Sequence, residues 1–170
     1  VSRDVWLKAG AQGLLCCSVP EEFGGPGGDF LMSAIVVEEL SRIGATGPGF
    51  YLHSEIVAPY LVHYGTDEQK TRWLPKLASG EWVGAIAMTE PGTGSDLQNI
   101  KTTARADGNG YIINGAKTFI SNGQHADFII VVAKTDSQVS GSKGTSLLIV
   151  DTDSEGFSRG RNLDKIGLHS

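Results

Sequence analysis

The sequence has little cysteine, no long hydrophobic run and no excess of basic residues. Only 2 of its 170 residues are cysteines, and these two, Cys16 and Cys17, are adjacent. Adjacent cysteines fit neither the C-x-x-C spacing of a metal site nor an ordinary disulfide framework, so we expect a reducing compartment and no metal. The apolar run Phe128–Ala133 is far shorter than the roughly 18 residues that a membrane helix needs, so no membrane span is expected.

Basic residues are outnumbered by acidic ones, 14 against 19, and the formal net charge is -5. This balance, without a stripe of lysine and arginine, argues against nucleic acid as a general partner. The chain begins at Val1 rather than methionine and shows no charged-then-apolar signal segment. We therefore expect a sequence that is either processed or part of something longer.

Glycine is the residue in excess. The chain holds 23 glycines, about twice the ordinary usage, and they follow no three-residue period, which excludes collagen. They should serve turns, or backbone that approaches a ligand closely. A length of 170 residues suits one ordinary domain or two small ones.

The first half of the chain has helical periodicity. Ser2, Asp29 and Thr66 each precede an amphipathic segment and are predicted to be helix N-caps, Thr66 as part of a capping box. The helix that Thr66 opens is predicted to end near Trp73, and Pro75 to begin another short turn.

The second half consists of short apolar runs separated by turn residues, which is typical of antiparallel strands. The segment Asp107–Gly110 separates two such runs, and Asn114-Gly115 is the strongest two-residue hairpin signal in the chain. The continuous runs Phe128–Ala133 and Ser146–Asp151 indicate buried strands. The predicted fold class is α+β, with a helical domain at residues 1–84 and a small antiparallel β-barrel or sandwich at residues 85–170.

The most unusual segment, Met88–Asp96, lies where the two halves meet. Gly92 and Gly94 would let backbone N–H groups approach a phosphate or a flat ring without obstruction. The same residues are equally consistent with a tight loop in which Ser95 and Asp96 cap the following chain. The loop has neither the G-x-G-x-x-G spacing of a dinucleotide fold nor the Gly-Lys-Ser/Thr of a Walker loop.

Two stretches of the chain resemble signatures of the acyl-CoA dehydrogenases. The run Met-Thr-Glu-Pro-Gly-x-Gly-Ser-Asp is similar to the first, and Asn-Gly-x-Lys-x-Phe-Ile-Ser-Asn-Gly at residues 114–123 to the second. The similarity extends to Pro20–Gly25, Gly65–Lys70 and Arg161–Gly167. Phe-Ile-Ser, where many members have Trp-Ile-Thr, makes the long-chain enzymes the nearest relatives. The sequence departs from the signature at Asn99, outside the flavin positions.

The resemblance implies an FAD-dependent oxidoreductase of fatty acid β-oxidation and lipid metabolism. Its reaction is the α,β-dehydrogenation of a fatty acyl-CoA thioester to a trans-2-enoyl-CoA, with hydride transfer to the flavin. Carried over position by position, the flavin contacts would be Ile86, Met88, Thr89, Gly94, Ser95, Phe119, Ile120 and Ser121. The substrate contacts would be Ser95, Gly144 and Thr145.

The resemblance places the catalytic carboxylate outside this chain. In the family that base lies in a C-terminal helical domain, which we expect this chain to lack, so the chain alone is expected to be inactive. Glu90 lies in the segment Met88–Asp96, which we call the flavin loop, but its place in the motif implies a structural role. A Ser95–His125–Asp96 hydrolase would need a G-x-S-x-G elbow that the sequence does not contain.

The family also implies partners and a location. These are an acyl-CoA substrate, an electron-transfer flavoprotein as acceptor, a homotetramer or homodimer, and either the bacterial cytoplasm or the mitochondrial matrix. Two other functions remain open: an acyl-CoA oxidase or flavin monooxygenase on the same scaffold, and an inert fragment that only binds FAD or CoA.

Overall fold

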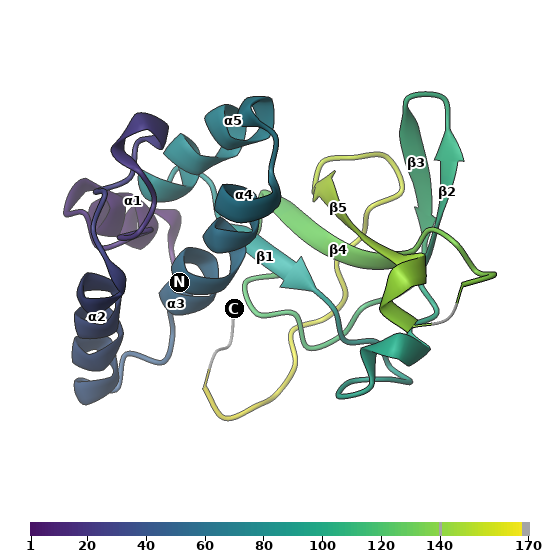
Figure 1. Ribbon diagram of the computed structural model, residues 1–170. Coiled ribbons are helices and arrows are strands. Elements are labelled where there is room, and N and C mark those ends of the chain that lie inside the picture. Colours follow the sequence, from purple (N-terminus) through teal and green to yellow (C-terminus); the bar gives the residue numbers. More distant parts are fainter. Residues whose placement is uncertain (140, 168–170) are drawn as a thin grey trace.

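The computed structural model describes residues 1–139 and 141–167, with helices in the first half and strands in the second (Figure 1). The early elements are α1 (Arg3–Ala11), η1 (Glu21–Phe23), α2 (Phe30–Arg42), α3 (Phe50–Leu52), η2 (His53–Val57), α4 (Ala58–Tyr64) and α5 (Asp67–Ala78). The later ones are β1 (Gly84–Ala87), η3 (Leu97–Asn99), β2 (Thr103–Asp107), β3 (Gly110–Asn114), β4 (Phe128–Lys134), η4 (Gly141–Gly144) and β5 (Thr145–Asp151). The predicted α+β class is confirmed.

The predicted helix starts are confirmed, and two of the three predicted caps form side-chain bonds. The Asp29 carboxylate accepts the backbone N–H groups of Leu31 and Met32 at the start of α2. Thr66 and Gln69 form the reciprocal capping box of α5. Ser2 stands at the N-cap position of α1, but its side chain makes no capping bond.

The predicted end of the last helix near Trp73 is wrong. α5 continues without interruption through Pro75 to Ala78. A proline inside a helix costs about 3 kcal/mol, but this turn buries Trp73, Leu74 and Leu77. Burial of large apolar side chains is worth about 1.5–3 kcal/mol for each one, so packing outweighs the local penalty.

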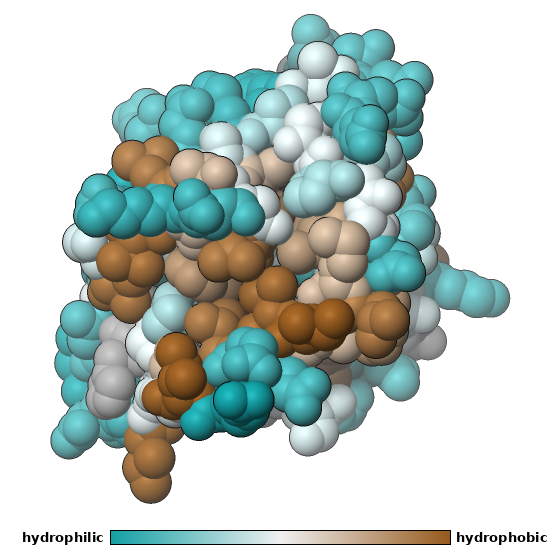
Figure 2. Space-filling model, turned by 90° about the vertical axis from the view of Figure 1, so that its left-hand side faces the viewer, coloured by the Kyte–Doolittle hydropathy of each residue, from teal (hydrophilic) through white to brown (hydrophobic). Residues whose placement is uncertain are grey.

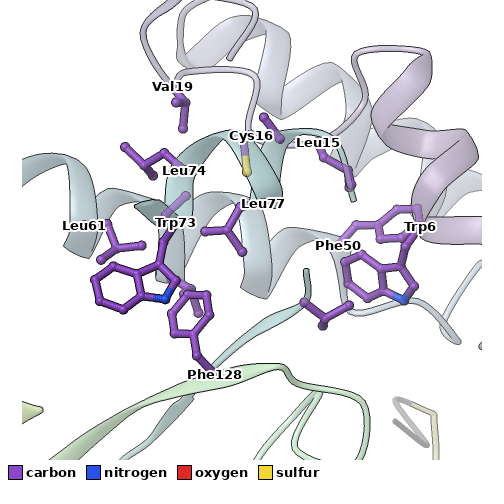
Figure 3. Packing of buried hydrophobic residues seen from close by; sticks show 14 of the residues in the cluster. Trp6, Leu15, Cys16, Val19, Phe50, Leu61, Trp73, Leu74, Leu77 and Phe128 are labelled. Carbon is purple, nitrogen blue, oxygen red and sulfur yellow. The ribbon is translucent and has the colours of Figure 1, made fainter. Parts of the chain in front are cut away.

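The main core lies between the helices and one face of the sheet (Figure 3). Trp6 meets Phe50 edge-on, with ring centroids 4.7 Å apart, and Trp73 faces Phe128 across 5.9 Å. Alternate β4 residues divide between the two faces, as the period of a strand requires. Phe128 and Ile130 join the helical core, whereas Ile129 and Val131 join a smaller cluster on the opposite face.

β4 is the central strand. β5 pairs with it in antiparallel fashion along its whole length, and β2 joins it at the Thr103–Lys134 pair. The antiparallel prediction fails for β1, which pairs with β4 in parallel from Gly84–Phe128 to Ala87–Val131. Parallel neighbours need a long crossover connection, and the intervening segment, which contains the β2–β3 hairpin, supplies it.

The predicted hairpin at Asp107–Gly110 is confirmed, because Asp107 and Gly110 pair across the turn between β2 and β3. The predicted hairpin at Asn114-Gly115 is wrong, since β3 ends there and no described strand returns along it. A Cβ at Gly115 would lie 2.7 Å from the Cα of Thr102. This glycine therefore serves a close approach between two backbone segments rather than a turn.

Helix α2 contributes little to the core. Ser33 is the one buried residue of this fully described helix, whereas Phe30, Leu31 and Ile35 are exposed. Figure 2 shows apolar side chains gathered on this side of the molecule. None of the helices in the described ranges is long and apolar enough to cross a membrane.

Candidate functional site

The first signature continues directly from the end of β1. Ile86 is buried in the helical core, and Met88 packs partly against the same cluster. Thr89 is half-buried, and its backbone carbonyl accepts the Thr118 N–H at 2.9 Å. Of the predicted flavin contacts at the end of β1, Thr89 carries the one side-chain hydroxyl, whereas Ile86 is largely covered by protein.

The loop that follows is closed by its own backbone. The N–H groups of Glu90 and Thr93 each donate to the carbonyl of the other, at 2.9 and 3.1 Å. Gly94 and Ser95 are exposed beyond this turn. A Cβ at Gly94 would meet nothing closer than the Thr89 Cγ2, at 3.9 Å. The space in front of this loop is therefore open for a ligand.

Asp96 caps the short helix η3. Its carboxylate accepts the backbone N–H of Gln98 and the side-chain amide of Asn99. The capping role that we considered for this residue is thus confirmed. A carboxylate engaged in this way is not hydrogen-bonded to His125, so the structure gives no support to a Ser95–His125–Asp96 triad.

The second signature lies directly beside the first. Lys117 Nζ donates to the Met88 carbonyl at 2.9 Å, next to the Thr118–Thr89 bond. At the other end, Asn122 Nδ2 donates to the carbonyls of Gly49 and Gly84, at 3.0 and 3.4 Å. The structure therefore brings the two signatures into contact at Met88 and Thr89, and Asn122 ties the end of the second signature to the start of β1.

Phe119, Ile120 and Ser121 lie between these anchors. Phe119 is 68% exposed and has a φ of 57°, in the left-handed region that few residues other than glycine adopt. An exposed aromatic ring held in an unusual backbone conformation is a typical feature of a ligand contact. Phe119 therefore offers the clearest apolar surface for a flat ring in this segment.

A broad groove of about 1250 Å³ adjoins the second signature. Its walls include Phe119, Ile120 and residues of β3, β4 and β5, but not Met88, Thr89 or Ser95. Three buried polar atoms on its lining residues have no hydrogen-bond partner in the described ranges: Thr102 Oγ1, Trp73 Nε1 and Asp151 Oδ1. The groove is lined by apolar strand residues and, in nearly equal measure, by polar and charged side chains, which fits a flat ring with polar edges, such as a flavin.

Gly144 and Thr145 take part in closing a loop. The Gly144 carbonyl accepts the N–H groups of Thr135 and Asp136, and a Cβ at Gly144 would collide with the Asp136 and Val139 carbonyls. The Thr145 hydroxyl donates to the Ser142 carbonyl at 2.8 Å. These bonds give both residues a role in the loop itself, and their predicted contact with substrate stays a prediction.

His53 supports the start of β1, a role that the sequence did not predict. It is fully buried, its Nδ1 accepts the Gly84 N–H at 3.1 Å, and its Nε2 lies 3.0 Å from the Leu77 carbonyl. Because Gly84 must donate, the ring proton belongs on Nε2. Burial is the main cause that lowers the pKa of His53 to about 4. Together with Asn122, this neutral ring fixes the first residue of β1.

Metal chemistry finds no support in the described residues, which hold no group of three or more histidine, cysteine or acidic side chains able to bind an ion. His169 lies outside these ranges. Cys16 and Cys17 are both buried and unbridged.

Comparison with known proteins identifies the family. The model described as "Acyl-CoA dehydrogenase, N-terminal domain" matches residues 1–81, and "Acyl-CoA dehydrogenase, middle domain" matches residues 85–170. The mitochondrial long-chain specific acyl-CoA dehydrogenase of Sus scrofa is 51% identical over 99% of this chain and 39% of its own length. The mitochondrial isovaleryl-CoA dehydrogenase of Pongo abelii is 44% identical over 98% of this chain and 40% of its own length.

Solved structures agree with these matches. The crystal structure of an acyl-CoA dehydrogenase from Geobacillus kaustophilus superposes with a TM-score of 0.94 and 53% identity, over 100% of this chain and 45% of that one. The chain thus spans about 40% of the length of the curated relatives it matches. The sequence signatures, their contact in the fold and these matches agree, and the chain belongs to the acyl-CoA dehydrogenase family.

Proposed function

We propose that the protein containing this chain is an FAD-dependent acyl-CoA dehydrogenase that acts on fatty acyl-CoA thioesters. Members of the family are flavoproteins of fatty acid β-oxidation. The observation that carries the proposal is the pair of hydrogen bonds from Lys117 and Thr118 to Met88 and Thr89, which joins the two signatures. A groove beside this junction has room for a flat ring.

The proposed reaction removes two hydrogens from neighbouring carbons. A carboxylate base takes the α-hydrogen as a proton, the β-hydrogen leaves as hydride, and a trans double bond forms between the two carbons. FAD, when bound, supplies the hydride acceptor. The family resemblance implies that the base lies in the C-terminal helical domain, and the Glu90 carboxylate of this chain is engaged in hydrogen bonds to Lys101, Thr102 and Lys117.

The residues of this chain bind and orient. The Thr89 hydroxyl would hydrogen-bond the flavin ring near its reacting nitrogen, and Met88 and Ile86 support that segment from the core. Phe119, Ile120 and Ser121 would cover another part of the ring and exclude water. Gly94 and Ser95 would face the pyrophosphate or the CoA portion, and Gly144 and Thr145 would contact the substrate.

Thr89→Ala in the full-length protein should weaken FAD binding or slow flavin reduction by about tenfold, because one hydrogen bond to a group that gains charge is lost. The measurement is FAD titration together with stopped-flow reduction by an acyl-CoA. Thr71→Ala, on the exposed side of α5, is the matched control and should leave both unchanged. Wild-type values for Thr89→Ala in both assays would show that Thr89 does not contact the ring.

The 170-residue chain by itself should not turn over acyl-CoA, because the base and one wall of the flavin site would be absent. The assay uses an artificial electron acceptor and compares the chain with the full-length protein at equal concentration. Retention of FAD without enoyl-CoA formation would indicate a binding fragment. Turnover by the chain alone would contradict our assignment of the base.

Partners, division and location follow from the same proposal. We propose an electron-transfer flavoprotein as acceptor, a homotetramer or homodimer, a helical part at residues 1–84 and a β part at residues 85–170. The mitochondrial and bacterial relatives support the matrix or the bacterial cytoplasm.

Faster reoxidation of the reduced flavin by oxygen than by an electron-transfer flavoprotein would instead identify an oxidase. A panel of straight and branched acyl-CoA thioesters of different lengths measures which substrate the full-length protein prefers.

A further inference from the structure

A buried pair of opposite charges links the flavin loop to the second signature, and the proposed reaction does not use it. Glu90 is 5% and Lys117 10% exposed at the side chain, and Lys117 Nζ lies 2.9 Å from Glu90 Oε1. We propose that Glu90 and Lys117 are positioning residues whose ion pair holds Thr89 in place against the flavin. This inference rests on the proposed function, and it concerns two residues to which the proposed reaction assigns no role.

The pair joins three separate segments of the chain. Glu90 accepts the backbone N–H groups of Lys101 and Thr102, which lead into β2. Lys117, from the second signature, donates both to Glu90 and to the Met88 carbonyl, at 2.9 Å each. Both charges therefore have several partners, as buried charges require.

The bond between Lys117 and the Met88 carbonyl is the step that reaches Thr89. It fixes the peptide unit between Met88 and Thr89, and the neighbouring Thr118 N–H fixes the Thr89 carbonyl. With a bond on each side of the residue, the Thr89 backbone is held in place, and with it the point from which the Thr89 side chain projects. Without Lys117, the Met88 carbonyl would lose its side-chain donor.

Stability alone does not explain a buried ion pair at this position. Replacing a buried pair by neutral side chains of similar size is often neutral or stabilising, whereas removing one partner leaves an uncompensated charge. What a neutral pair cannot supply is an ammonium group that binds a carboxylate and a carbonyl at once. The geometry thus assigns the ion pair the role of holding the flavin loop in position.

Glu90 is unsuited to act as the base itself. Burial raises the pKa of this carboxyl, but hydrogen bonds from Thr102, Lys101 and Lys117 outweigh it and lower the pKa to about 2. A base with so low a pKa has little tendency to take a proton near neutral pH. The structural role that the motif implied for Glu90 therefore agrees with its surroundings.

The experiment separates positioning from stability with Glu90→Gln, Lys117→Met and the double variant Glu90→Gln/Lys117→Met in the full-length protein. Each single variant should lower the free energy of unfolding of the apoprotein. The double variant should regain most of that loss, because no unpaired charge remains. FAD affinity should stay about tenfold weaker in Lys117→Met and in the double variant, because both remove the Lys117 donor from the Met88 carbonyl.

A second readout identifies Thr89 as the intermediary. In the double variant, the reduction potential of bound FAD should fall in the same direction as in Thr89→Ala, because the same hydrogen bond to the reduced ring is weakened. Adding Thr89→Ala to the double variant should then shift the potential no further. Amide hydrogen exchange at Thr118 should also be faster in the double variant, a change visible without flavin.

Arg3→Met is the matched control, since it breaks an ion pair with Asp127 outside the two signatures and should leave FAD affinity at the wild-type value. Recovery of FAD affinity together with stability in the double variant, or a further shift of potential on adding Thr89→Ala, would overturn the inference alone. Failure of the wild-type full-length protein to bind FAD would overturn both this inference and the proposed function.

Discussion

Replacing Phe128 with alanine should lower the free energy of unfolding of this chain by about 3–5 kcal/mol. Phe128 is fully buried where the sheet meets the helices, with Trp73 and Trp82 at ring distances of 5.9 and 6.4 Å. Removing its ring would leave a cavity between two layers that cannot collapse independently (Figure 3). Urea unfolding followed by tryptophan fluorescence measures the loss.

The matched control is Phe30→Ala, because the same change at a side chain that is 81% exposed should cost less than about 0.5 kcal/mol. The contrast between the two phenylalanines tests the placement of the core directly. Similar losses at both positions would mean that Phe30 is covered or that Phe128 is not the bridge between helices and sheet.

Lowering the pH from 6.5 towards 4 should destabilise the chain by up to about 3 kcal/mol through His53 alone. Burial holds the pKa of His53 at about 4 in the folded state, against 6.5 for an ordinary histidine. The unfolded chain therefore takes up the proton first as the pH falls. The stability that this neutral ring contributes is fully present above pH 6.5 and is lost progressively down to pH 4.

The surroundings of His53 decide the size of this effect. The Leu77 carbonyl and Asp127 favour the protonated ring, whereas Arg3 opposes it, and burial exceeds each of them. Unfolding free energies at pH 7 and pH 4.5, compared between wild type and His53→Gln, isolate this residue. Glu90 does not interfere, because its pKa of about 2 places its own loss of stability below that range. An equal pH slope in both proteins would refute the assignment.

Local signals in the sequence predicted the elements better than their partners. The Asp29 cap and the Thr66–Gln69 box depend on residues within one turn of helix, and both are present. The helix end predicted near Trp73 is wrong because burial of the last turn of α5 against other elements outweighs the local cost of Pro75. The hairpin predicted at Asn114-Gly115 is wrong because Gly115 is needed for a different reason: the backbone of Thr102 packs too closely against it to leave room for a Cβ.

The candidate site followed the same division. Resemblance identified the segments around Thr89 and Phe119, and the structure places those segments in contact. The resemblance implied a structural role for Glu90, and Lys117 lies between the glycine and phenylalanine of the second signature. It did not show what Glu90, Lys117 and His53 hold, because these residues act through bonds to backbone groups in other elements.

The parallel pairing of β1 with β4 sets the order in which the sheet can assemble. Gly84 must meet Phe128 across the whole crossover, which includes the β2–β3 hairpin, before β1 gains any ladder bond to β4. Closing so long a loop is entropically costly, whereas the hairpin and the β4–β5 pair join near neighbours. The flavin loop, which begins where β1 ends, is therefore among the last parts of the molecule to reach its native conformation during folding.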